Sequence, residues 1–307
     1  MEHNQLFDAI IIGGSYSGMS AALSLGRSLR KTLIIDDGKP CNRSTPHSHN
    51  FLTRDGATPG YIAEVAREQL GAYPTVSWLN QHAMHAKRDH DMFVVETGDN
   101  KIWHSKRLIL AAGIKDLLPG TPGFADSWGI SVIHCPYCHG YEFRQKRTGI
   151  WADAERTLHL APLVRNLTAD VCVFTDGKTV FDGEQRTKLR QLGIRILEQE
   201  IGSLEHENGH LKHIVLKDGQ SVPLDTLYAA IPFEHHTAIH RELGCAETAQ
   251  GYIQVDAFQK TTVPGVFACG DNSSGMRSVA NAVLTGSVAG AMVNKELADE
   301  GLFAAMP

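Results

Sequence analysis

The stretch FDAIIIGGSYSGMSAALSLGRSLRKTLIID, residues 7–36, contains a complete strand–turn–helix–strand pattern. Six mostly apolar residues predict a short buried strand, and a glycine-containing turn from Gly13 to Gly18 follows it. A segment with helical periodicity comes next, and the second predicted strand ends at Asp36. An acid at this distance from the glycines, about 20 residues, is typical of a dinucleotide-binding unit.

The same stretch predicts how such a ligand would be held. The helix N-terminus would direct free backbone N–H groups at a pyrophosphate, and the carboxylate of Asp36 would bind a ribose hydroxyl. Ser15 replaces the middle glycine of the G-x-G-x-x-G pattern, but its side chain is small enough for close backbone approach. The alternative is a tight strand–helix turn without a ligand. The predicted cofactor-binding residues here are Gly13, Ser15, Gly18 and Asp36.

A second region with cofactor-type features lies near the C-terminus, in TTVPGVFACGDNSSGMRSVANAVLTGSVAGAMV. A short predicted strand ends at Asp271, which could bind a ribityl chain, and a long helix of small residues opens near Arg277, Ser278 and Val279. The positive end of that helix could face the electron-rich edge of a flavin. The segment RLILAAG gives another strand end, at Gly113.

Together with the Cys-x-x-Cys at 135–138, these motifs occur in the order and spacing of low-molecular-weight thioredoxin reductases, which the chain resembles over nearly its whole length. The resemblance implies an α/β protein of two Rossmann-like three-layer domains, the second inserted into the first. The FAD-binding domain would comprise residues 1–116 and 249–307. The inserted domain, residues 117–248, carries the cysteines and binds NADPH in that family. The resemblance also implies a homodimer.

The predicted NADPH site of the insert lacks its usual features. The turn after the strand RTGIWA is WADAER, and no glycine occurs between Gly149 and Gly177. Asp153 and Glu155 stand where a pyrophosphate would need bare N–H groups, so they would repel it. The family's arginine cluster for the 2′-phosphate is reduced to Lys178. The sequence therefore argues against NADPH, the alternative being a degenerate site that still works.

The segment VIHCPYCHGYE, residues 132–142, allows three interpretations. A zinc site needs a second ligand pair, and the only candidates are His235, His236 and His240 of FEHHTAIH, which we expect to be surface residues. No metal is therefore predicted. The tetrapeptide CPYC also occurs in glutaredoxins, but those are small separate domains. The remaining interpretation is a redox-active pair.

As a redox pair, the two cysteines have different predicted roles. Pro136 suits the first turn of a helix, which places Cys135 near the N-terminus and favours its thiolate. By the resemblance, Cys138 would face the flavin and Cys135 would exchange with the substrate.

The residue after the second cysteine is an acidic proton donor in thioredoxin reductases, whereas here it is His139. A histidine titrates near neutrality and could accept a proton from an incoming thiol. Glu142 could orient its imidazole if the segment is helical. The motif CHGYE resembles that of flavin-dependent dithiol oxidases of the gliotoxin and holomycin type. The alternative role for His139 is a contact at the helix end.

The segment PCNRSTPHSHNFLTRDG, residues 40–56, lies in the region that wraps FAD in the thioredoxin reductases that the chain resembles. Asn50 is a candidate for bonding the flavin ring. His47 and His49 are either close to the flavin or solvated on a surface loop.

The 307-residue chain has a formal net charge of −5 and no phosphate-tracking cluster of Lys and Arg, so nucleic acid is not an expected partner. No segment approaches the roughly 18 apolar residues of a membrane helix, and the N-terminus lacks signal-peptide features. We expect a cytoplasmic protein.

Three functional hypotheses follow. The first is an FAD-dependent thiol oxidase that forms disulfides with O2 as acceptor. The second is a disulfide reductase of thioredoxin type, fed by NADPH at an atypical site or by another donor. The third is a flavoprotein that binds partners or senses redox state without turnover. The substrate would be a dithiol or disulfide, either a small molecule or a small redox protein.

Overall fold

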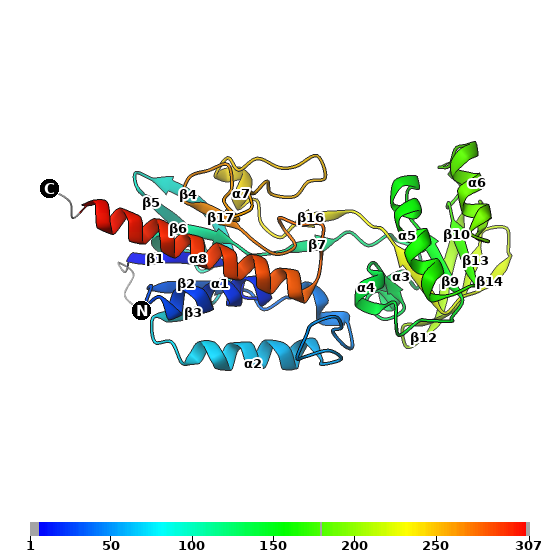
Figure 1. The fold of residues 1–307 in the computed structure, drawn as a ribbon, viewed down its shortest axis with the longest axis horizontal. Coiled ribbons are helices and arrows are strands. Elements are labelled where there is room, and N and C mark those ends of the chain that lie inside the picture. Colours follow the sequence, from blue (N-terminus) through cyan, green and yellow to red (C-terminus); the bar gives the residue numbers. More distant parts are fainter. Residues whose placement is uncertain (1–5, 179, 305–307) are drawn as a thin grey trace.

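A computed structural model describes residues 6–178 and 180–304 and shows two α/β bodies joined by a narrow connection (Figure 1). The first body contains a sheet of seven strands in the order β3-β2-β1-β6-β5-β4, with β17 paired to β6. Its elements are β1 (Leu6–Ile12), α1 (Tyr16–Arg27), β2 (Thr32–Asp36), the 3₁₀ helix η1 (Cys41–Ser44), α2 (Pro59–Gly71), β3 (Val76–Asn80), β4 (Ala83–Asp89), β5 (Met92–Thr97), β6 (Ile102–Leu110), α7 (Ile239–Glu242), β17 (Val266–Ala268) and α8 (Val279–Ala304).

The first body has three layers, as predicted. Strands β1, β2, β3, β6 and β17 run parallel, and β5 and β4 continue the sheet in antiparallel fashion. Strand β1 is buried on both faces, as its apolar sequence predicts. Ile11 on one face packs with α1 and α8, while Ile10 on the other packs with Phe93 and Trp103.

Helices α1 and α8 cross at very short range, which two glycines of α8 make possible. A Cβ on Gly286 would overlap the carbonyl oxygen of Ser17, and one on Gly290 would lie too close to the backbone of Ala21. The C-terminal helix therefore lies directly on the helix that follows the first glycine turn (Figure 1).

The inserted body repeats the architecture at smaller scale. Its parallel sheet has the order β11-β10-β9-β15-β8, with α5 and α6 packed through one core cluster and the antiparallel sheet β12-β13-β14 through the other. Its elements are α3 (Phe124–Ser127), β8 (Val132–Ile133), α4 (Pro136–His139), β9 (Thr148–Trp151), α5 (Ala154–Leu167), β10 (Val171–Phe174), α6 (Gly183–Gln191), β11 (Arg195–Leu197), β12 (Ile201–Glu207), β13 (His210–Leu216), β14 (Ser221–Pro223) and β15 (Thr226–Ala229).

The two bodies are connected by β7 (Ile114–Asp116) and β16 (Phe233–His235), which pair antiparallel. The chain leaves the first body near the predicted residue 116 but returns at β16, well before the predicted boundary at 249. Ile239 and Cys245 lie in the core of the first body, against β1 and β6, because their apolar side chains cover that face of its sheet. The predicted second boundary is therefore wrong.

Within the described ranges, no helix combines the length and apolarity that crossing a bilayer requires.

Candidate active site

A cavity of about 520 Å³ lies at the carboxyl ends of the parallel strands of the first body, the usual ligand position in such sheets. Residues of the inserted body line its other side, and helix α4 lies on the side of that body that faces the first (Figure 1). The predicted residues that line the cavity are Gly13, Ser15, Asp36, Gly113, Cys138, His139, Asp271, Arg277, Ser278 and Val279.

The glycine turn after β1 is shaped for close approach. Gly13 has φ +105°, and a Cβ there would overlap the carbonyl oxygen of Ala111 at the end of β6. A Cβ on Gly18 would overlap the carbonyl of Gly13. Ser15 is the N-cap of α1, but its side chain makes no capping hydrogen bond, so the N–H groups of the first turn stay available to an anion.

Asp36 ends β2 with its carboxylate fixed beside that turn. The backbone N–H of Gly14 donates to Oδ1 at 2.8 Å, and that of Gly38 donates to Oδ2 at 3.2 Å. The carboxylate oxygens retain further lone pairs for a ribose hydroxyl. The turn and the acid therefore fit the adenosine and pyrophosphate part of FAD.

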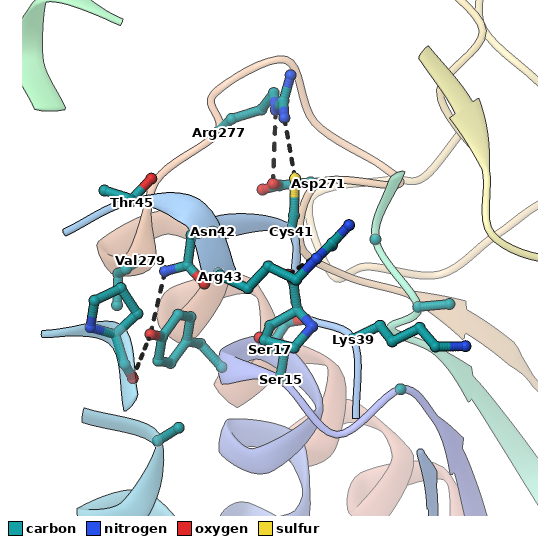
Figure 2. A pocket seen from close by; sticks show the side chains of 18 of the residues that line it. Ser15, Ser17, Lys39, Cys41, Asn42, Arg43, Thr45, Asp271, Arg277 and Val279 are labelled. Carbon is teal, nitrogen blue, oxygen red and sulfur yellow. Dashed lines mark hydrogen bonds and ion pairs between the residues drawn. The ribbon is translucent and has the colours of Figure 1, made fainter. Parts of the chain in front are cut away.

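Asp271 and Arg277 lie on the far side of the cavity, across from Ser15 and Ser17 (Figure 2). Burial raises the pKa of Asp271 to about 6, and the nearby Arg277 opposes this shift. Arg277 precedes α8, which begins at Val279, with Ser278 accepting a hydrogen bond from the N–H of Asn281 at 3.1 Å. The predicted start of this helix at Arg277 is therefore two residues too early.

Sequence reasoning missed what holds Arg277. Its guanidinium donates to both carboxylate oxygens of Asp116, at 2.8 and 3.0 Å, and lies 3.3 Å from the sulfur of Cys41. Asp116 ends the connecting strand β7, so the ion pair ties the connection to the loop before α8. Cys41 lies in the segment 40–56 assigned to FAD wrapping, but nothing in the sequence pairs it or Asp116 with Arg277, and only the fold brings the three together.

The two cysteines lie differently with respect to the cavity. Cys138 lines the cavity, whereas Cys135 is the N-cap residue of α4 and is not among the lining residues. The two sulfurs are 2.9 Å apart. The hydrogen bond from Cys138, assisted by the backbone N–H groups of Cys138 and Tyr137, lowers the pKa of Cys135 to about 7 against the effect of burial. The same bond, together with burial, raises the pKa of Cys138. Cys135 is thus the thiol that ionises first.

His139 also lines the cavity, and burial, then the neighbouring His49, lower its pKa. Neither of its ring nitrogens has a hydrogen-bond partner among the described residues, although both are buried. The imidazole is therefore neutral at pH 7, with a lone pair available to accept a proton. Unpartnered nitrogens facing this cavity also fit a bound molecule that would supply the missing contacts.

The prediction that Glu142 orients His139 is not met. Helix α4 stops at His139, so the one-turn helical spacing that would align the two side chains is lost. Glu142 instead lies with Oε1 3.7 Å from Nε2 of His49. Glu142 remains close enough to raise the pKa of His139 slightly against the effect of burial.

Asn50 is not brought to the cavity. It is exposed, has φ +57°, and its backbone N–H donates to Asp55 at 2.7 Å, so the residue serves the turn of its loop. Its predicted bond to the flavin ring is therefore not supported. His49 lines the cavity, whereas His47 is exposed and bonds through Nδ1 to the carbonyl of Gly56 at 2.9 Å.

At the expected nucleotide site of the insert, carboxylates lie at the first turn of α5. The carboxylate of Asp153 accepts a hydrogen bond from the backbone N–H of Arg156 at 2.8 Å, and Glu155 adds a second negative charge in the first turn of α5. Beyond β10, the carboxylate of Asp176 accepts a bond from the N–H of Ile201 at 2.8 Å. Carboxylates thus occupy both positions where a phosphate would need donors.

The FEHHTAIH histidines are less exposed than predicted. His240 is 2% exposed, and its Nε2 lies 2.7 Å from Glu247, because α7 packs onto the sheet of the first body. His235 bonds the carbonyl of Gly251 at 2.8 Å. Although His235, His240 and Glu247 are close enough to surround an ion, Arg241 also bonds Glu247 at 2.7 Å. These groups satisfy one another, and the arginine would repel a cation.

Because Cys138 of the inserted body lines the nucleotide-type cavity of the first, with Cys135 beside it, the molecule has the architecture of a flavin-linked disulfide oxidoreductase. The chain belongs to the pyridine nucleotide-disulphide oxidoreductase family, which residues 7–286 match. This family acts on sulfur groups and implies bound FAD.

Individual relatives match this chain over nearly its full length. The chain is 31% identical to thioredoxin reductase tcpT of Claviceps purpurea, over 97% of this chain and 96% of that protein. An oxidoreductase structure from Agrobacterium tumefaciens is 38% identical with a TM-score of 0.90, covering 96% of this chain and 99% of that one. The structure of HlmI is 28% identical with a TM-score of 0.93, covering 99% and 96%.

Proposed function

We propose that the protein is an FAD-dependent dithiol oxidase that forms disulfides with O2 as electron acceptor. One contrast carries the proposal: the first βα turn leaves its N–H groups free, whereas the corresponding turn of the insert is capped by the carboxylate of Asp153. This contrast favours a flavin in the first body and argues against a pyridine nucleotide in the insert. In the proposed function electrons therefore enter through the cysteines.

In the proposed reaction, a substrate thiolate attacks Cys135 in the Cys135–Cys138 disulfide, and the second substrate thiol resolves the mixed disulfide. The products are the substrate disulfide and the reduced pair, with two electrons transferred. His139 takes a proton from an incoming thiol, which is mostly protonated at neutral pH. FAD supplies the two-electron relay to O2, so that dithiol and O2 give disulfide and hydrogen peroxide overall.

The cofactor-binding roles are part of the same proposal. Gly13, Ser15 and Gly18 would admit the pyrophosphate, and Asp36 would bind the ribose. On the other side, Asp271, Ser278 and Val279 would hold the ribityl chain and the ring edge, with Arg277 fixing that loop and Gly113 leaving space at the end of β6. We also propose a cytoplasmic homodimer, which remains a prediction.

The alternative is an NADPH-dependent disulfide reductase, favoured by the name of the relative thioredoxin reductase tcpT. Purified protein with bound FAD is mixed without oxygen, first with NADPH and then with dithiothreitol, while flavin absorbance is followed. We expect NADPH to leave the flavin oxidised, dithiothreitol to bleach it, and air to restore it with release of hydrogen peroxide.

Rapid bleaching at micromolar NADPH would contradict the oxidase proposal and support the reductase. Protein that neither donor reduces would support the redox-sensing hypothesis. Folded protein that is colourless and takes up no added FAD would remove the basis of all three.

A further inference from the structure

His49 lies between the buried imidazole of His139 and two acidic side chains at the surface. The ring centroids of the two histidines are 6.5 Å apart, with the rings nearly perpendicular at 84°. Nε2 of His49 is 3.7 Å from Oε1 of Glu142, and Nδ1 is 3.7 Å from Oδ1 of Asp55. Each of its ring nitrogens therefore lies near a carboxylate, and its ring lies beside that of His139.

Exposure increases along this series of residues. The ring nitrogens of His139 are buried, the His49 side chain is 21% exposed, and those of Glu142 and Asp55 are 37% and 67% exposed. Both histidines line the cavity. Proton transfer between rings at this separation would pass through a bridging water. The series therefore connects the interior of the cavity with bulk solvent.

The proposed reaction needs such a connection. A dithiol loses two electrons and two protons when it becomes a disulfide, and O2 takes up two of each only later, when hydrogen peroxide forms. Between these steps protons have to be stored or exchanged with solvent. His139 has no acceptor of its own among the described residues, so it has to pass its proton on before it can accept another.

We propose that His49 carries protons between His139 and solvent, with Glu142 and Asp55 as its surface partners. A proton leaves the substrate thiol for His139, moves to His49, and exits beside the carboxylates; the path reverses when protons return. His49 thus acts through His139 and does not touch the reacting sulfurs. This inference rests on the proposed oxidase function and identifies its proton path.

His47 provides the matched control. It belongs to the same loop and its ring lies 6.4 Å from that of His49, but it is exposed and bonded to a backbone carbonyl. The titratable groups that face His49 are therefore Asp55 and His47 on its own loop and Glu142 and His139 on the segment beyond the cysteines. Any change in pH dependence has to be assigned among these four.

The first test follows anaerobic flavin reduction by dithiothreitol in weak buffer from pH 6 to 9. We expect His49→Gln to slow reduction about 10- to 100-fold at pH 7, at or below the low end of the range for positioned proton transfer. Added imidazole should restore much of the rate by carrying the proton directly. His47→Gln should behave as the parent protein at each pH.

The second test needs no turnover. Histidine resonances are titrated by NMR in the oxidised holoprotein. Because a charged His49 lowers the pKa of His139, His49→Gln should raise the pKa of His139, whereas His47→Gln should not. If His49→Gln does not fold, the double variant Glu142→Gln/Asp55→Asn removes both surface partners and should likewise slow reduction and respond to imidazole.

A slowed variant that imidazole does not rescue, with the His139 titration unchanged, would show a structural role only and overturn the inference. A parental rate in weak buffer would do the same. A parent protein that dithiothreitol fails to reduce would instead contradict the proposed function, so the two failures are distinguishable.

Discussion

His139 combines two properties that rarely occur together, a buried imidazole and the lack of any described hydrogen-bond partner. Burial keeps it neutral at pH 7, and its position beside Cys138 puts it within the wall of the cavity. An acidic residue at this position would be ionised at neutral pH and would be a weak base. Once protonated, it would be suited to donating that proton to a leaving thiolate. The histidine instead suits acceptance of a proton from a thiol.

Replacing His139 by alanine should slow dithiol oxidation about 10²–10⁴-fold at pH 7, the usual contribution of positioned proton transfer. Stopped-flow reduction of the flavin by dithiothreitol measures this. Raising the pH should recover part of the rate, because the substrate thiol, with a pKa of about 8.5, then ionises without a base. In the parent protein the lowered pKa of His139 should keep it in the basic form below pH 6.5.

His139→Asp is the informative partner variant, because it introduces the residue type of the thioredoxin reductases. It should retain FAD and remain slow in thiol oxidation at pH 7. If His139→Ala oxidises dithiol at the parental rate from pH 6 to 9, His139 is only a helix-end contact.

The elements that hold the cofactor cavity are α1 and α8, and their close crossing depends on small residues. Gly286 is buried against the backbone of Ser17 in the first turn of α1, next to Gly18 of the cofactor turn. Any displacement of α8 is therefore transmitted to the N–H groups proposed to hold the pyrophosphate.

Gly286→Ala should lower the free energy of unfolding by about 1–3 kcal/mol, because the added methyl group forces the two helices apart. It should also weaken FAD retention. Gly301→Ala, in the same helix but with no atom near the added Cβ, should be neutral or raise stability by up to about 1 kcal/mol through helix propensity. Urea unfolding followed by circular dichroism, with flavin absorbance after gel filtration, measures both. Equal effects of the two substitutions would show that the crossing is not tight.

At the scale of the whole molecule, the connection between the bodies is held by two ion pairs of different burial on neighbouring residues of β7. Asp116 pairs with Arg277, and the two side chains are only 8% and 13% exposed. Lys115 pairs with Glu234 across the ribbon, with both side chains at least half exposed. The buried pair also lies close to the cysteines, since the carbonyl of Arg277 is 3.8 Å from the sulfur of Cys138.

Asp116→Ala should lower the free energy of unfolding by about 3–5 kcal/mol, because it leaves the Arg277 guanidinium buried without its carboxylate. Lys115→Ala should change it by less than about 1 kcal/mol, since the exposed pair is screened by water. The double variant Asp116→Ala/Arg277→Met should recover part of the loss. Denaturant unfolding of the three proteins tests this, and similar losses for both single variants would contradict the difference in burial.

Local patterns in the sequence determined the glycine-containing βαβ unit at 7–36, the strand end at Asp36 and the turn without glycine at Asp153. These features could be predicted because periodicity, turn glycines and cap residues act over a few neighbouring residues. The same holds for Cys135 at a helix start, where Pro136 fixes the first turn.

Only the tertiary structure decided which distant residues meet at the cavity. It brought Asp116 and Cys41 to Arg277, turned Glu142 toward His49 instead of His139, and left Asn50 on the surface. It also returned the chain to the first body at β16, because Ile239 and Cys245 bury their side chains against its sheet. Such pairings depend on how the two bodies pack across long separations in the chain, and no local propensity encodes them.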